Sequence, residues 1–474
     1  MKVTSSLLLI ACAMVVQAQA GEPRIPAIHS TDLFHPHGDP DDHYDLATAF
    51  AIDELDLKAV ILDLGEQQAT RSGKRAVDQM NHIAGRNVPC AIGLSRKFRT
   101  PTDTGRDEPA QFQQGVELLL SVLRQSKQKV VITATGSCRD VAAAFNREPE
   151  LLKSKVRAVY INIGRGPGQS QQECNVNYDP LAYQRMFEAD LPLYWCPCFG
   201  ADGYQTLYRC DQSTVVGACT PPVQNFFVYC LTRSQADPIE FLAGGPPSLP
   251  TGGRSMWCTA PMFHAAGRKI YKRGENDYVA LRPDAAAKAG LADREVDVFR
   301  FVPMRVTIDR QSRAEPEQPA KPKPGELSAA FQGREVDRVG TGDLKPDGKL
   351  DCQVAVLGVA PERELKNIII TGPNEGRWEH VETGRWWRVA PQRNGRRLDV
   401  YFQFWAAGEH QVELVYHDGS SQSATFHVPD FGTPGLRVEL EPAEPSGFVF
   451  RSVHPEYQQI LASCLKNLLA TLGR

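Results

Sequence analysis

From about Pro26 to Met304, short apolar runs alternate with stretches that repeat apolar residues at helical spacing. This β-α order predicts a mostly parallel, Rossmann-like sheet with helices on both faces. In such sheets ligands bind at the carboxyl ends of the strands, so the polar residues that follow each run are the first candidates for chemistry. The apolar runs cover residues 25–33, 57–62, 88–92, 129–133, 156–161 and 191–195.

The pattern changes in the second half of the chain. Residues 311–333 are rich in proline and charge, which is typical of a semi-rigid linker. Over residues 334–430, short β-rich runs are separated by turn residues such as Asp418-Gly419, and they predict an all-β sandwich. Residues 431–474 form a tail with an amphipathic helix. The α/β domain is therefore expected to span residues 21–310.

The first 20 residues have the pattern of a signal peptide. Lys2 is followed by an apolar run and by the small-residue site Ala18-Gln19-Ala20, so the mature chain is expected to begin near Gly21. The apolar run is too short for a transmembrane helix. We therefore expect a secreted or periplasmic protein. Cys12 lies in a lipoprotein-like box, but the apolar run continues beyond it, which favours plain cleavage.

Composition and cysteine spacing narrow the classes of partner. The 474 residues carry a formal net charge of only −3, which gives no electrostatic reason to bind nucleic acid or an anionic membrane. Eleven cysteines follow Cys12, and five of them crowd residues 196–230. Cys196-Pro197-Cys198 lacks the spacing of a zinc knuckle, so disulfides or buried thiols are favoured over zinc.

An acidic loop follows the first apolar run. It contains Asp39, Asp41, Asp42 and Asp45 and opens a predicted helix, while Asp32 ends the strand before it. One aspartate could simply cap the helix. Several carboxylates at one strand end repel one another, and a hard cation or a polar ligand between them relieves that repulsion. The loop therefore predicts a cation or sugar site.

Three histidines lie in or beside the same loop, namely His35, His37 and His43. A metal ligand, a general acid and a solvated loop residue are all roles that a histidine takes in such a position. Because carboxylates dominate the loop, its donors suit calcium better than zinc. We expect at most one of the histidines to be functional.

Four segments in order give the chain a resemblance to a known family. The acidic loop is followed by Ile132–Ser137 with a Thr-Gly turn, by Gly164-Arg165-Gly166, and by Glu173–Pro180 with its Glu-x-Asn and Asp-Pro pairs. Together they resemble the inosine/uridine-preferring nucleoside hydrolases over about residues 25–270. The resemblance implies hydrolysis of an N-glycosidic bond by a metal-bound water.

The resemblance also implies a calcium site. Asp42 is similar to the bidentate Ca²⁺ ligand of the family, and Thr135 to the residue that donates a backbone carbonyl. Asp39 or Asp32 would take the remaining early ligand and the role of base, and the longer loop leaves open which of them does so. A bound cation lowers the pKa of its water, and carboxylates stabilise an oxocarbenium-like transition state.

Candidate substrate contacts come from several segments. By the resemblance, Asp41, Glu173 and Asn175 would bind ribose hydroxyls. From its own position at a strand end, Glu66 is a candidate catalytic base or sugar binder. Trp257 is a candidate for stacking on a base or sugar ring, although large aromatic residues near strand ends commonly belong to the core.

The chain departs from the family pattern in three places. The family has an asparagine after its second strand, where this chain has Gly65-Glu66. The late His-Asp-Pro segment, which supplies a calcium ligand, corresponds here to residues 255–261, and these contain no aspartate. An asparagine expected before Glu173 is also missing. The metal site is therefore expected to be altered.

The leading hypothesis is an exported, calcium-dependent N-glycosyl hydrolase of a nucleoside or related ribosyl compound. Two alternatives stay open: a non-catalytic sugar or glycan binder on the same fold, and a hydrolase of another glycoside. The β domain could bind a glycan through tryptophans, although sandwich domains also use them as core. Assembly into a homo-oligomer is left open. The tryptophans of this domain are Trp378, Trp386, Trp387 and Trp405.

Overall fold

A nine-stranded sheet forms the centre of the main domain in the computed structural model. Its strand order is β20-β11-β21-β6-β5-β4-β1-β2-β3. The six strands from β6 to β3 in this order are parallel, which confirms the predicted α/β class. These six strands are β1 (Ile25–Thr31), β2 (Leu55–Leu62), β3 (Cys90–Ile92), β4 (Val130–Ala134), β5 (Val156–Asn162) and β6 (Leu193–Cys196).

The structure describes most of the chain but not all of it. The leader predicted over residues 1–20 lies outside the described residues. So do the side chains of the four tryptophans considered as a glycan platform. The described residues are 24–169, 171, 173–245, 248–309, 319–334, 352–373, 377–379, 389–402, 408–428 and 435–474.

Helices cover both faces of the sheet because neighbouring residues on each strand point to opposite sides. Ala27 packs into one core and Ile28 into the other, and Val131 and Ile132 divide in the same way. One core is covered by α1 (Asp41–Ala51), α3 (Lys74–Ala84), α10 (Pro221–Leu231), α12 (Thr259–Ala265) and α14 (Tyr457–Leu469). The other is covered by α4 (Ala110–Gln125), α5 (Arg139–Arg147), α6 (Pro149–Lys155) and α8 (Pro180–Glu188).

Shorter elements connect these layers. Two antiparallel pairs lie outside the main sheet, β7 (Tyr208–Asp211) with β8 (Gly253–Met256) and β9 (Lys269–Gly274) with β10 (Asp277–Leu281). The remaining helices are α2 (Gly65–Thr70), α7 (Cys174–Tyr178), α9 (Gln212–Gly217), α11 (Pro238–Leu242) and α13 (Pro283–Lys288).

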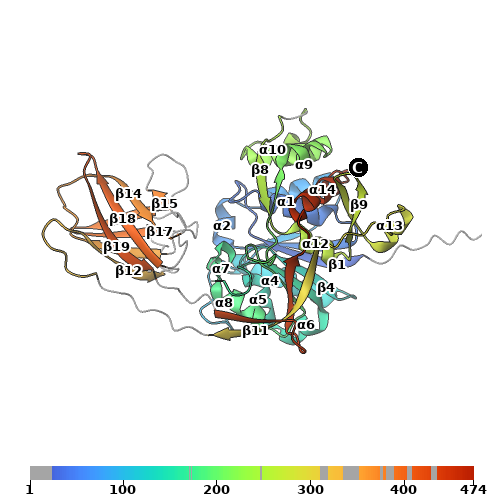
Figure 1. The fold of residues 1–474 in the computed structure, drawn as a ribbon, viewed down its shortest axis with the longest axis horizontal. Helices are drawn as coiled ribbons and strands as arrows, with labels where there is room; N and C mark the ends of the chain where they lie inside the picture. The colour runs from blue at the N-terminus through green and yellow to red at the C-terminus, as the bar shows by residue number, and fades with distance from the viewer. Residues whose placement is uncertain are drawn as a thin grey trace, which may run out of the picture.

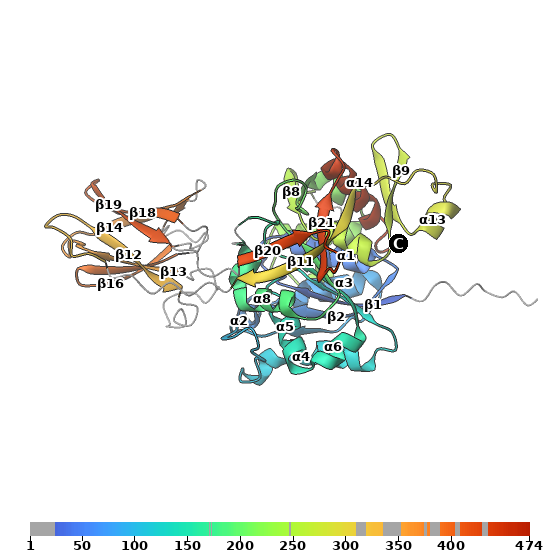
Figure 2. The same cartoon turned by 60° about the horizontal axis from the view of Figure 1, so that its bottom comes forward.

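The end of the chain completes the main sheet. β21 (Gly447–Ser452) pairs in parallel with β6, and β11 (Phe299–Asp309) pairs antiparallel with both β21 and β20 (Gly435–Leu440). Figure 2 shows these three strands side by side. The stretch 431–474, which the sequence pattern assigned to a tail, therefore supplies two strands and a helix of the main domain.

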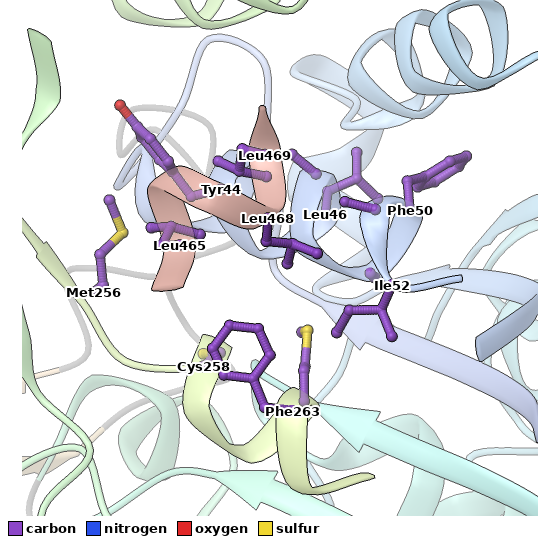
Figure 3. Close-up of a cluster of buried hydrophobic side chains, with 14 of the residues drawn as sticks. Tyr44, Leu46, Phe50, Ile52, Met256, Cys258, Phe263, Leu465, Leu468 and Leu469 are labelled. Atoms are coloured by element: carbon purple, nitrogen blue, oxygen red, sulfur yellow. The ribbon is translucent and has the colours of Figure 1, made fainter. Parts of the chain in front are cut away.

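Helix α14 packs on the helix that carries the acidic residues. Leu465, Leu468 and Leu469 are buried against residues of α1, among them Tyr44 and Leu46 (Figure 3). The apolar spacing of this helix predicted such a buried face. The C-terminal segment thus holds α1 in place behind the acidic loop.

Two four-stranded antiparallel sheets form the β domain, in the orders β12-β13-β17-β16 and β15-β14-β18-β19. They share a core that includes Val354, Ile370 and Leu414. The hairpin predicted at Asp418-Gly419 joins β18 to β19. Strand β12 begins inside the stretch 311–333 that the pattern assigned to a linker. The strands are β12 (Ser328–Arg334), β13 (Cys352–Leu357), β14 (Leu365–Thr371), β15 (Arg377–Glu379), β16 (Val389–Asn394), β17 (Arg397–Phe402), β18 (Gly408–Tyr416) and β19 (Ser421–Val428).

In chain order the β domain lies between β11 and β20, so it is an insertion into the main domain. Figure 1 shows its strands as a unit of their own beside the α/β body. Within the described residues, no helix is long and apolar enough to cross a membrane. Within the described residues the eleven cysteines after Cys12 form no disulfide with one another, and nine of them are buried, which agrees with the buried-thiol alternative.

Candidate active site

Backbone hydrogen bonds bring the ends of three parallel strands together. Thr31 of β1 lies opposite Leu62 of β2, and Ser30 lies opposite Ala134 of β4. Beyond the paired positions, the N–H of Thr135 donates to the carbonyl of Ser30 at 2.8 Å. The residues that follow β1, β2 and β4 therefore meet at one edge of the sheet, as expected for a site of this fold.

The acidic loop delivers three carboxylates to this edge from the start of α1. Asp41, Asp42 and Asp45 are buried, and one ligand atom from each lies within 4.8 Å of the others. Thr31 Oγ1 donates to Asp42 Oδ1 at 3.5 Å, which links the helix to the end of β1. The predicted residues Asp41 and Asp42 therefore lie together, and Asp45 joins them.

Burial and mutual repulsion disfavour the charged form of these groups. Removal from water raises the pKa of Asp41 and Asp42 well above the usual range, and neighbouring aspartates raise it further. The pKa of Asp32 is also raised, first by burial and then by the charges of Asp63 and Glu173. Asp32 therefore belongs to the same acidic cluster.

Asp39 lies at the outer margin of the cluster. Its side chain is 55% exposed, and Arg254 Nη1 approaches its Oδ1 to 3.6 Å. A hydrogen bond between Asp39 and Asp41 contributes to the raised pKa of Asp41. Asp39 is thus the member of the loop that reaches solvent and also has a basic partner.

The segment that begins at Glu173 forms another wall of the site. Glu173 caps α7, because its Oε1 accepts from the N–H of Asn175 at 3.1 Å, and its Oε2 accepts from the N–H of Gly164 at 2.9 Å. Asn175 Nδ2 donates to the carbonyl of Thr135 at 3.1 Å and to the carbonyl of Asn162 at 3.4 Å. The three predicted residues Thr135, Glu173 and Asn175 are therefore connected in the structure.

Glu66 and Trp257 occupy different environments. Glu66 is exposed in the first turn of α2, and no hydrogen bond ties it to the acidic cluster in the described residues. Trp257 is partly buried and meets Phe199 edge to face at 5.9 Å. Its buried indole Nε1–H has no partner in the described part of the chain. That N–H is available to a ligand acceptor, while Glu66 faces solvent.

Sequence reasoning missed Asp63, which directly follows β2 and precedes Glu66 by three positions. Its Oδ2 accepts from the N–H of Ser137 at 2.6 Å, and its Oδ1 accepts from the N–H of Leu64 at 2.7 Å. A Cβ on Gly136 would lie 2.6 Å from Asp63 Oδ2, so the Thr-Gly turn needs its glycine. The position right after an apolar run was the signal that singles out Asp63.

Asp45 was counted among the acids of the loop but was given no role of its own. It lies four positions after Asp41 and three after Asp42, and that helical spacing places the three side chains on one face. Burial raises its pKa to about 7, although the Cys258 thiol favours the ionised form. The spacing of the three aspartates was readable in the sequence.

Two of the loop histidines, His35 and His43, pack in the core rather than line the carboxylates. His35 Nε2 donates to the carbonyl of Ser234 at 2.6 Å, and its ring stacks on Tyr229 at 4.5 Å. His43 is buried against Phe226, and burial lowers its pKa well below the usual range. These two residues are therefore neutral core groups at physiological pH.

The donors of the site fit a hard divalent cation. They are carboxylate oxygens, the Thr135 carbonyl lies at the same edge, and no N–H or O–H group of the described residues donates to either oxygen of buried Asp45. Ion pairs in the same part of the chain provide a basic partner for Asp39 but for none of Asp41, Asp42 and Asp45. Oxygen-rich sites of this kind suit Ca²⁺ or Mg²⁺.

Comparison with known proteins gives an independent view of this chain. A family model described as inosine-uridine preferring nucleoside hydrolase matches residues 31–321. This span contains the acidic loop, Thr135, Asn175 and Trp257. It also contains the strands that position them.

Individual relatives are more distant. The chain is 30% identical over 187 residues to the pyrimidine-specific ribonucleoside hydrolase RihA of Enterobacter sp. (strain 638), a match that covers 36% of this chain and 58% of the relative. RihA of Klebsiella pneumoniae subsp. pneumoniae is 29% identical over 171 residues, with 32% and 55% covered. The chain thus spans less than two thirds of the length of these curated relatives.

Solved structures show weaker likeness. The purine-preferring ribonucleoside hydrolase from Gardnerella vaginalis matches with a TM-score of 0.36 and 18% identity, covering 51% of this chain and 79% of that one. The inosine-uridine preferring nucleoside hydrolase from Bacillus anthracis matches with a TM-score of 0.29 and 14% identity, covering 50% and 91%.

Proposed function

The chain belongs to the inosine-uridine preferring nucleoside hydrolase family, and on that basis we propose that it hydrolyses the N-glycosidic bond of a nucleoside or a related ribosyl compound. The observation that carries the proposal is the acidic cluster at the carboxyl edge of the parallel strands. Asp41 and Asp42 are buried together there, and their unfavourable charges are tolerated when a cation or a polar ligand sits among them.

The residues around the cluster suit a sugar ring. The carboxylate of Asp41 and the amide oxygen of Asn175 can accept hydrogen bonds from ribose hydroxyls. The carboxylate of Glu173 can do the same, and backbone N–H groups hold it in place. Trp257 contributes an aromatic face and a free indole N–H beside Phe199. Ring stacking and a few fixed polar groups are typical of small-molecule sites.

Asp39 and Asp41 are suited to move a proton together. Asp39 reaches solvent and has Arg254 as a counter-ion, while Asp41 shares a hydrogen bond with it. A proton taken from water by one carboxylate can be held between the two. Asp32 is the alternative base. The charges of Asp63 and Glu173 raise its pKa more than the charge of Asp39 does, so Asp32 belongs to the side of the site that holds Asp63 and Glu173.

Calcium is the cation that we propose for the site, held by Asp42, by the Thr135 carbonyl and by Asp32 or Asp39. When bound, such a cation lowers the pKa of a water and neutralises the carboxylates around it. The chain itself contributes the preformed edge, because Asn175 ties Thr135 to α7 and Thr31 ties Asp42 to β1.

The test is release of free base and reducing ribose from a panel of purine and pyrimidine ribonucleosides. We expect turnover by the purified protein in calcium, and a loss of about 10²-fold or more in Asp42→Asn. Asp53→Asn is the matched control, because the Asp53 side chain is 88% exposed and lies away from the cluster. No release from any nucleoside by the well-folded wild type would contradict the proposal.

The same assay separates the two alternative functions. These alternatives stay open because residues 255–261, unlike the corresponding family segment, contain no aspartate. Reducing sugar released from another glycoside, without free base, would favour a different glycosidase. Sugar binding without turnover would favour a binding protein, with or without a contribution of the β domain to glycan binding.

Export of the chain stays a proposal that rests on the N-terminal pattern alone. Mass spectrometry of the mature protein should find Gly21 at the N-terminus. A lipidated N-terminus at Cys12 would show a lipoprotein instead. Light scattering of the same preparation would establish whether the chain forms a homo-oligomer.

A further inference from the structure

Asp45 is a carboxylate that the proposed function has not used. It lies in α1, an eleven-residue helix in which every residue is buried, and its own side chain is 0% exposed. An isolated charge in such a position costs several kcal/mol unless a partner compensates it. The residue therefore needs a physical explanation of its own.

The protein around Asp45 provides almost no compensation. The partner that Asp45 has within the described residues is the thiol of Cys258, which favours the ionised form of the carboxylate. A thiol is only a weak donor, and no N–H or O–H group of the described residues donates to Oδ1 or Oδ2. Apart from the thiol, both oxygens are available to something that the polypeptide does not supply.

The position of Asp45 points to a cation as that partner. A ligand atom of Asp45 lies within 4.8 Å of ligand atoms of both Asp41 and Asp42, close enough for one ion to contact all three. Cation–oxygen distances of 2.3–2.6 Å allow this span for Ca²⁺. The helical spacing of the three residues fixes the arrangement, because positions 41, 42 and 45 share a face of α1.

Cys258 belongs to the segment that, by the family resemblance, lacks an expected aspartate. It is buried, at the N-cap of α12, within residues 255–261, which contain no aspartate or glutamate. Helix α1 reaches the same place from the other side, and Figure 3 shows Cys258 among the residues of α1, α12 and α14. An acid that residues 255–261 do not provide is present on α1, where Asp45 contacts Cys258.

We propose that Asp45 is a ligand of the divalent cation and supplies from helix α1 the carboxylate that the segment around Cys258 lacks. This inference rests on the proposed function only in that a cation binds at Asp42. It predicts that one carboxylate ligand comes from a different element than in the family pattern, and that cation binding is not weakened by this change. It also explains why α1 carries three acids on one buried face.

Calcium binding measured by calorimetry tests the inference without an activity assay. The proteins are the full mature chain, Asp45→Asn, Asp42→Asn and the surface control Asp53→Asn. We expect the Kd for Ca²⁺ to rise by about tenfold or more in Asp45→Asn and in Asp42→Asn, and to stay unchanged in Asp53→Asn. Wild-type affinity in Asp45→Asn would overturn the inference while leaving the proposed function in place.

Thermal unfolding provides a second readout and controls for folding. In EDTA, Asp45→Asn should unfold at a temperature equal to or above the wild type, because the substitution removes one of three carboxyl groups that are buried together. In calcium, its rise in Tm should be smaller than that of the wild type. A lower Tm in EDTA together with an unchanged calcium-induced rise would show a structural role and overturn the inference.

A double variant that moves the carboxylate from position 45 to position 258 provides a further test. Asp45→Ala alone should lose calcium affinity, and combination with Cys258→Asp should recover it, because the carboxylate returns from the other side. Recovery would support a shared coordination position. Absence of any calcium binding in the wild type would overturn the inference together with the calcium-dependent function, a result distinguishable from loss in Asp45→Asn alone.

Discussion

Asn175 donates a hydrogen bond of 3.1 Å to the carbonyl of Thr135 and so ties helix α7 to the end of strand β4. The same Nδ2 group reaches the carbonyl of Asn162 at the end of β5. One side-chain amide therefore joins three elements around the proposed cation. Its orientation sets where the Thr135 carbonyl points.

Replacing this amide should damage both stability and the site. In Asn175→Asp a carboxylate would face two carbonyl oxygens, and both hydrogen bonds would be lost. We expect the free energy of unfolding to fall by about 1–3 kcal/mol in urea titrations. The exposed residue Asn87 offers the matched control, Asn87→Asp, which should change stability by less than about 0.5 kcal/mol. Equal effects of the two substitutions would argue against the role of Asn175.

Asp63 should act as a positioning residue for the turn after β4. Each carboxylate oxygen of Asp63 accepts from a different backbone N–H. In Asp63→Asn one of the two oxygens becomes an NH₂ group, which cannot accept, so the N–H of Ser137 or of Leu64 loses its partner. We expect a loss of about 1–3 kcal/mol in the free energy of unfolding and weaker calcium binding. Glu66→Gln, on the exposed face of α2, should leave stability unchanged. Unaltered stability of Asp63→Asn would contradict this role.

The cation-free protein should lose stability as the pH rises. The pKa of Asp45 is about 7 in the folded chain against 3.8 for an ordinary aspartate, so the folded state holds the extra proton between those values. The free energy of unfolding should therefore decrease from pH 4 to pH 7, by an amount on the order of 4 kcal/mol for Asp45 alone.

Urea titrations in EDTA across that pH range measure this slope. In Asp45→Asn the decrease should be smaller, because one of the titrating groups is gone. Added calcium should stabilise the wild type more at pH 7 than at pH 5, since ligand carboxylates must lose their protons. A wild-type stability that rises between pH 4 and pH 7 in EDTA would show that burial does not govern these carboxylates.

Helix α14 should be essential to the main domain. Leu465 is 0% exposed between α14 and α1, so Leu465→Ala should cost about 2–5 kcal/mol through lost burial and a cavity. Leu440→Ala is the matched control, because Leu440 on β20 is 36% exposed. The comparison requires only thermal or urea unfolding. Similar costs for both substitutions would mean that α14 is not part of the core.

Many of the strands of the main sheet could be predicted from the pattern of apolar residues alone. The runs 129–133 and 156–161 are mostly apolar because both sheet faces are covered, and they appear as β4 and β5. Strands β20 and β21 were not predicted. Both strands are short and follow an inserted domain. Strand β20 also lies at the edge of the sheet, where Leu440 is partly exposed to water. Neither the length nor the hydrophobic period of these segments therefore identifies them as strands.

The site was predictable where the chemistry is local. Asp41 and Asp42 were identified because their charges are adjacent in sequence. Asp63 was overlooked because a single aspartate after a strand looks like an ordinary turn residue. Asp45 was counted with the acidic loop but received no role, because an aspartate inside a helix looks like a solvated one. Only the tertiary structure shows that Cys258, at the N-cap of α12, contacts Asp45 and that Ser137 meets Asp63.

The position of the β domain in the chain has a consequence for biosynthesis. Strand β21 pairs with β6, and α14 packs on α1, but both are translated after the whole sandwich. The α/β domain therefore cannot close its core while it emerges first from the ribosome, unlike domains that fold as N-terminal units. The inserted sandwich can fold before its host does, and completion of the host waits for the last residues of the chain.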